Sequence, residues 1–122
     1  MSSAERPAEG DGTDDGGLRV TREDVAGTLV LRFTGCLDLN GLPVAEREVR
    51  AAEEYAPAVL LLDFSTLEFV DSSGVRLVLQ AEERAAAAGR RLRVALGTGL
   101  PRRLFQVLGL LDRLDLAEEP PA

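Results

Sequence analysis

The sequence predicts an α/β fold in a single domain: a mostly parallel sheet of about five strands with an antiparallel edge, packed with three to four helices. Two observations carry this prediction. Short strand-like segments alternate with segments of helical periodicity, in the order β-β-α-β-α-β-α-β. One strand, 58–63, is almost continuously apolar, as expected where both faces of a strand are covered. With 122 residues the chain can form one hydrophobic core.

The first half of the domain begins at residue 18. Residues 18–25 and 28–33 are two apolar segments joined by a short turn, which predicts a β-hairpin. Apolar residues then recur at helical spacing from Leu42 to Ala56, and Pro43 stands where a first helical turn tolerates it. The buried strand 58–63 follows this amphipathic helix.

The second half continues the alternation. The expected elements are a helix over 72–88, a strand over 92–96, a short helix over 101–108 and a weak last strand over 111–116. Gly89 follows the first of these helices in the position of a left-handed cap, and Gly109 closes the second. Parallel strands in this order are joined by right-handed crossovers, which leaves the first strand as the antiparallel edge.

The composition separates the two ends of the chain from the domain. Residues 1–17 contain one arginine against five acidic residues, a local charge of −4, and predict a disordered acidic tail. Residues 18–116 are expected to form the domain, and residues 117–122 a C-terminal tail.

Charge and apolar content exclude several classes of partner. The net charge of −7 and the pI near 4.6 disfavour binding to nucleic acid, which needs clustered cations. The longest fully apolar run, 59–62, is too short to cross a bilayer. Cys36 is the only cysteine and nothing near the start resembles a signal peptide, so we expect a protein of the reducing cytoplasm. The expected partner is another protein or a small molecule.

Functional groups of such a sheet are expected in the loops after the carboxyl ends of its parallel strands. Three loops meet there: 35–38, 69–74 and 97–99. The second leads into the helix that begins near Ser72, where Asp71 or Ser72 could serve as a helix cap worth about 1 kcal/mol. A phosphate on Ser72 would lie beside the positive end of the helix dipole, and its charge would repel the carboxylates of a partner. From the residues alone, both interpretations stay open.

Enzymatic roles find little support in the residues. The chain contains no histidine and no lysine, so a serine nucleophile would lack its usual bases. Asp38, Asp63 and Asp71 could gather at one end of the sheet and hold Mg²⁺, but capping and turn roles are better supported for these side chains. Cys36 has no second cysteine with which to form a zinc site or redox pair. The sequence therefore predicts a non-enzymatic protein without metal or cofactor.

Three segments taken together resemble the STAS domain of anti-sigma factor antagonists: FTGCLD at 33–38, VLLLDFS at 59–65 and FVDSSG at 69–74. The resemblance covers residues 18–116. It implies that the serine after the aspartate, Ser72 after Asp71, is phosphorylated by an anti-sigma factor that is also a serine kinase. The unphosphorylated protein would bind that anti-sigma factor and release the sigma factor, and a serine phosphatase would restore binding after phosphorylation.

The resemblance also implies a partner surface around Ser72. Its expected members are Asp38, Asp71, Ser73, Gly74, Arg76 and Thr98. A glutamate of the family's G-E-L-D segment is replaced by Cys36, and Arg76 stands where some relatives have a smaller residue, so either position could set specificity. The alternative is a STAS scaffold that binds its partner constitutively, or senses a nucleotide-like anion, with Ser72 only a helix cap.

Overall fold

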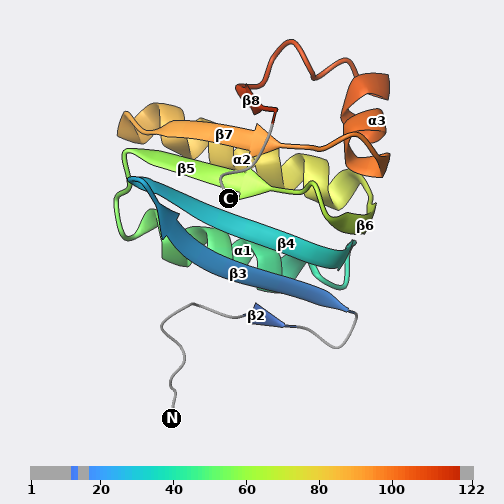
Figure 1. Cartoon of the computed structure of the whole chain (residues 1–122), viewed down its shortest axis with the longest axis horizontal. Coiled ribbons are helices and arrows are strands. Elements are labelled where there is room, and N and C mark those ends of the chain that lie inside the picture. Colours follow the sequence, from blue (N-terminus) through green and yellow to red (C-terminus); the bar gives the residue numbers. More distant parts are fainter. Residues whose placement is uncertain (1–11, 14–16, 119–122) are drawn as a thin grey trace.

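The computed structural model describes residues 12–13 and 17–118, which form one seven-stranded sheet covered by helices (Figure 1). The strands are β2 (Gly12–Thr13), β3 (Leu18–Val25), β4 (Thr28–Leu37), β5 (Val59–Asp63), β6 (Leu67–Val70), β7 (Arg91–Ala95) and β8 (Leu116–Ala117). Their order is β2-β3-β4-β5-β7-β8, and β6 pairs with β4 beyond the end of β5. The pairs β2–β3 and β3–β4 are antiparallel and the others are parallel. The predicted fold class is confirmed.

Three helices connect the strands: α1 (Leu42–Glu53), α2 (Ser72–Ala88) and α3 (Leu100–Val107). Figure 1 shows α1 and α2 on one face of the sheet, behind it in this view. The α3 helix lies at the end toward which β4, β5 and β7 point, and it packs against β6. Among the described residues, no helix combines the length and the apolar character that crossing a membrane requires.

The main core lies between the sheet and the two helices α1 and α2. Alternate residues of the central strands, such as Leu60 and Leu62 of β5, point into it and are fully buried. Val49 of α1 and Val78 of α2 meet them from the helix side. The opposite face of the sheet carries a smaller apolar cluster around Leu61. Burial on both faces explains why β5 is almost entirely apolar.

The hairpin between β3 and β4 closes through a two-residue turn. Ala26 and Gly27 both have positive φ, 54° and 86°, which matches the twist of a tight antiparallel hairpin. The N–H of Gly27 donates to the Asp24 Oδ1 at 3.2 Å. This turn aligns β4 with Thr28 opposite Val25, and β4 then continues as far as Leu37.

The two ends of the chain extend the sheet further than the sequence predicts. Of the expected tail 1–17, residues 1–11 and 14–16 lie outside the described residues, and Gly12–Thr13 form β2 beside β3. At the other end, Ala117 belongs to β8, and residues 119–122 are again outside the described part. The expected last strand over 111–116 is confined to Leu116–Ala117, because residues 111–113 form a turn.

The carboxylate of Asp115 links β7 to the segment before β8. The Arg91 Nε donates to the Asp115 Oδ2 at 2.6 Å, and the Arg93 Nε donates to Oδ1 at 3.3 Å. The hydrogen bond from Arg91, helped by Arg93, lowers the pKa of Asp115 despite its partial burial.

This shift predicts a pH dependence of stability. Because the folded-state pKa of Asp115 is below its unfolded value, its stabilisation is present above the unfolded pKa and is lost as the pH falls through the folded pKa. We expect Asp115→Asn to lower the melting temperature at neutral pH by a few degrees at most, since solvent reaches more than a third of this side chain and screens the ion pairs. Melting curves of both proteins between neutral and strongly acidic pH should converge at the acidic end. A constant difference across that range would contradict the assignment.

Candidate functional site

Ser72 is the first residue of α2, immediately after the residue that caps the helix. The cap is Asp71, whose backbone is extended (φ −119°, ψ −165°) and whose Oδ1 accepts the N–H of Ser73 at 2.8 Å. The side chain of Ser72 is exposed, and its hydroxyl makes no hydrogen bond with any residue in the described ranges. The capping role that the sequence left open between the two residues therefore falls to Asp71.

The strand β6 ends at Val70 and so places Asp71 and Ser72 at the end of the sheet. The sequence predicted no strand over Leu67–Val70. Leu67 pairs with Gly35 of β4, and Phe69 and Val70 pair with the next two residues after a register shift between Gly35 and Cys36. The N–H of Asp71 continues this ladder by donating to the carbonyl of Leu37 at 3.3 Å. The loop after β4 and the start of α2 are thereby placed side by side.

Gly74 and Ser73 lie beneath the exposed serine. A Cβ on Gly74 would come within 2.4 Å of the Val70 Cγ2 and 3.1 Å of the Leu37 Cδ2. Only a residue without a side chain lets the first turn of α2 pack this closely on β4 and β6. Ser73 is also buried, with 8% of its surface exposed. Ser73 and Gly74, which were predicted as members of the partner surface, are therefore buried and hold the helix start that carries Ser72.

Two further loops reach the same end of the sheet. The Asp38 Oδ1 accepts the N–H of Gly41 at 3.1 Å, which closes the turn before α1 and leaves Asp38 half-buried. In the loop 97–99, Gly97 has φ +69° and a Cβ there would lie 3.0 Å from that of Ser65. Thr98, next in this loop, is exposed. The three predicted segments all lie at the carboxyl ends of parallel strands. Two of them are not loops throughout: residues 35–37 belong to β4, and the segment 69–74 is divided between β6 and α2.

The three aspartates considered as magnesium ligands each bind a local partner. Asp63 is buried, and its Oδ1 accepts the Ser65 hydroxyl at 2.6 Å and the Ser65 N–H at 2.9 Å. Asp38 and Asp71 accept backbone N–H groups as described above. Within residues 12–13 and 17–118, no three carboxylates or thiols gather where they could hold a metal ion.

Exposed apolar side chains occur in the same loops. Leu39, just after Asp38, is 72% exposed, and Phe69 of β6 is 43% exposed. Leu100 is exposed at the start of α3. These residues were not among the predicted members of the partner surface, although large apolar side chains beside such a surface are a usable signal.

A protein-family model described as "Mlab, STAS domain" matches residues 20–117. The chain belongs to the STAS domain family. The match covers nearly all of the described domain, and it confirms the family to which the sequence segments pointed. No curated protein matches the chain.

Solved structures of related proteins agree with this assignment. An anti-sigma factor antagonist from Mycobacterium paratuberculosis has a TM-score of 0.79 and 22% identity, over 88% of this chain and 91% of that chain, which shows the common fold. The anti-sigma factor antagonist SpoIIAA in its unphosphorylated form has a TM-score of 0.68 and 29% identity, over 82% and 89%. The Bacillus cell fate determinant SpoIIAA in its phosphorylated form has a TM-score of 0.62 and 29% identity, over 82% and 92%. This STAS domain is thus similar to anti-sigma factor antagonists over most of their length.

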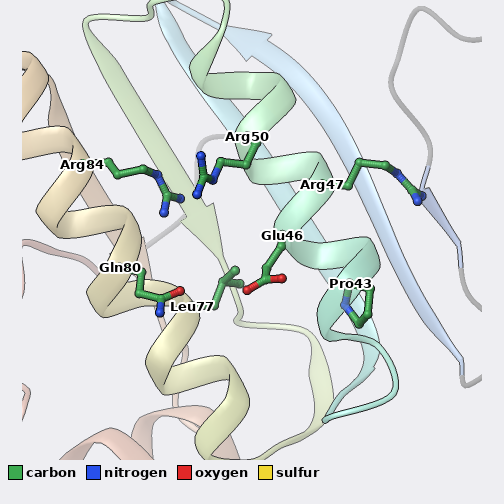
Figure 2. A pocket seen from close by; sticks show the side chains of 7 residues that line it. All are labelled: Pro43, Glu46, Arg47, Arg50, Leu77, Gln80 and Arg84. Atoms are coloured by element: carbon green, nitrogen blue, oxygen red, sulfur yellow. The ribbon is translucent and has the colours of Figure 1, made fainter.

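A groove of about 370 Å³ lies between α1 and α2 of the STAS domain (Figure 2). Its walls carry Pro43, Glu46, Arg47, Arg50, Leu77, Gln80 and Arg84. The Arg84 Nε donates to both carboxylate oxygens of Glu53, at 2.9 and 3.1 Å, and so ties the two helices together. Figure 2 shows Arg50 extending from α1 toward Arg84, whereas Arg47 points away from α2. The carboxylate of Glu53 neutralises part of the positive charge at this groove.

Proposed function

We propose that this STAS domain is a non-enzymatic anti-sigma factor antagonist whose binding to an anti-sigma factor with serine kinase activity ends when Ser72 is phosphorylated. The observation that carries the proposal is the exposed Ser72 hydroxyl, which has no hydrogen-bond partner in the described part of the chain. The similarity to SpoIIAA, of which both an unphosphorylated and a phosphorylated form are solved, supports it. Since sigma factors and ATP are cytoplasmic, the protein would act there.

The local geometry suits a phosphoryl acceptor. The Ser72 oxygen would form a bond to the γ-phosphorus of ATP while the bond from that phosphorus to the bridging oxygen breaks, ADP leaves, and the hydroxyl proton passes to a base of the kinase. Asp71 holds the helix start through Ser73, so the modification removes no hydrogen bond of the domain. A serine phosphatase would return the protein to its binding form.

The proposed partner surface consists of Ser72 with the side chains that are accessible around it. These are Asp38, Asp71, Arg76 and Thr98, with Ser73 and Gly74 as the packed layer below. The exposed apolar residues Leu39 and Phe69 would add the buried area that a protein interface needs. The alternative is a scaffold that binds its partner constitutively; in that case Ser72 would have no capping role, because Asp71 caps α2.

The proposal predicts a single phosphorylation. After incubation with ATP and the candidate anti-sigma kinase, intact-mass spectrometry should show one added phosphoryl group, and fragment mapping should assign it to Ser72. Ser72→Ala should accept none, whereas Ser73→Ala should still be modified, because Ser73 is buried. No modification by a kinase proven active on another substrate would refute the switch and favour a constitutive scaffold.

A further inference from the structure

The exposed face of α2 carries Arg76 one helical turn after Ser72. Residues four apart on a helix lie on the same face, with Cβ atoms about 5–6 Å apart. Arg76 is exposed, and its guanidinium has no ion pair or hydrogen bond within the described ranges. Most other arginines differ: Arg84 pairs with Glu53 and Arg91 with Asp115, for example. Within the described ranges the Arg76 guanidinium therefore stabilises no other side chain, and it lies one helical turn from the proposed phosphorylation site.

The groups around Ser72 leave a phosphate in need of such a cation. Asp71 already accepts the N–H of Ser73 with its side chain, and its carbonyl accepts the N–H of Gly74 at 3.0 Å. These donors at the start of α2 are thus engaged. Asp71 itself adds a negative charge next to Ser72, and Asp38 adds another from the neighbouring loop. The carboxylates repel a phosphate, these N–H groups are engaged, and the positive end of the helix dipole, about half an elementary charge, balances only part of the phosphate charge.

We propose that Arg76 is the counter-ion of the phosphate on Ser72, a role that rests on the proposed function. An anion four residues before a cation is the favoured order on a helix, because it agrees with the helix dipole. The planar guanidinium can give two parallel hydrogen bonds to phosphate oxygens. In the unphosphorylated protein the same guanidinium is open to a carboxylate of the partner. Phosphorylation would therefore have two effects. It adds negative charge to the partner surface, and it engages the Arg76 guanidinium, which is then no longer available to the partner.

The ion pair can be tested without any kinase. The full chain is produced with phosphoserine incorporated at position 72 during translation, and the phosphate is titrated by ³¹P NMR in low salt. Free phosphoserine has a second pKa near 6, and a paired cation favours the dianion. We expect this midpoint to lie about 0.3 pH unit lower in the native sequence than in Arg76→Gln, a roughly twofold change in acidity. Arg76→Lys should fall between the two, since it keeps the charge but loses the fork.

Arg50→Gln is the matched control. Arg50 is also exposed and unpaired within the described ranges, and Figure 2 shows it on α1 beside Arg84. Its substitution should leave the midpoint unchanged. The proposal is overturned if Arg76→Gln titrates like the native sequence, or if Arg50→Gln raises the midpoint equally, since only the general field would then act. Because the phosphate is installed during synthesis, a failure of any kinase to modify Ser72 would refute the proposed function and leave this measurement intact.

Discussion

Replacing Ser72 by aspartate should weaken binding of the proposed anti-sigma factor partner by about 100-fold or more. A like charge placed against a partner's carboxylates costs several kcal/mol, and every 1.4 kcal/mol is tenfold in affinity. The new carboxylate stands on an exposed position at the centre of the proposed surface, with Asp71 next to it, so the partner cannot avoid it. A full phosphate, with about twice the charge, should weaken binding further.

Calorimetric titration of the purified anti-sigma factor into the two proteins measures this difference. Ser72→Asn is the matched control, because asparagine has nearly the shape of aspartate but no charge. It should bind within about tenfold of the native protein if electrostatic repulsion is the cause. Equal losses in Ser72→Asn and Ser72→Asp would show that the surface rejects bulk and not charge. Native affinity in Ser72→Asp, with the fold intact by circular dichroism, would refute a charge-operated switch.

Replacing Phe64 by alanine should lower the free energy of unfolding by about 3–5 kcal/mol. Phe64 is fully buried just after β5, and its ring stands edge-on to Phe33 of β4 with centroids 5.0 Å apart. On its other side it packs against Phe105 of α3, with centroids 6.4 Å apart. Its removal would leave a cavity where the sheet and α3 meet. For a domain whose total stability is about 5–15 kcal/mol, this is a large fraction.

Urea denaturation followed by circular dichroism gives the comparison. Phe69→Ala removes the same side chain from a position that is 43% exposed, and it should cost less than about 1 kcal/mol. Phe64→Leu, which fills most of the cavity, should lie between the two. Similar losses in Phe64→Ala and Phe69→Ala would contradict the packing described here. Phe69→Ala should also weaken partner binding if the exposed ring belongs to the interface.

Much of the fold follows from patterns that are local in the sequence. The paired apolar segments of β3 and β4, and the helical spacing of α2 with Gly89 at its left-handed end, allowed these elements to be predicted. The strand β6 escaped prediction because four residues carry almost no periodicity. It exists because the far end of β4 offers a partner, with a register shift between Gly35 and Cys36, and that contact is distant in sequence. The helix α1 ends earlier than expected, at Glu53, because Ala56 adopts a positive φ of 52° in the turn that follows.

The position of the candidate site at one end of the sheet was predicted, but not which of its residues are exposed and which are buried. Ser72, Asp38 and Thr98 each follow a predicted strand, so they could be predicted to lie at one end of the sheet, because carboxyl ends of parallel strands share an edge. Burial could not be deduced in the same way. The depth of Gly74 depends on the Val70 and Leu37 side chains that meet it, and the choice of Asp71 as cap depends on backbone angles that both residues could have adopted.

Asp71 caps α2, whereas the proposed phosphorylation site is the next residue, Ser72. Fold maintenance rests on one side chain and the proposed signal on the next, so the two properties can be changed independently. An engineer could retune the regulation at position 72, for instance by making it permanently active or silent, without first compensating a loss of stability. In evolution the same arrangement lets a duplicated copy lose or change its signal while it remains a well-folded protein.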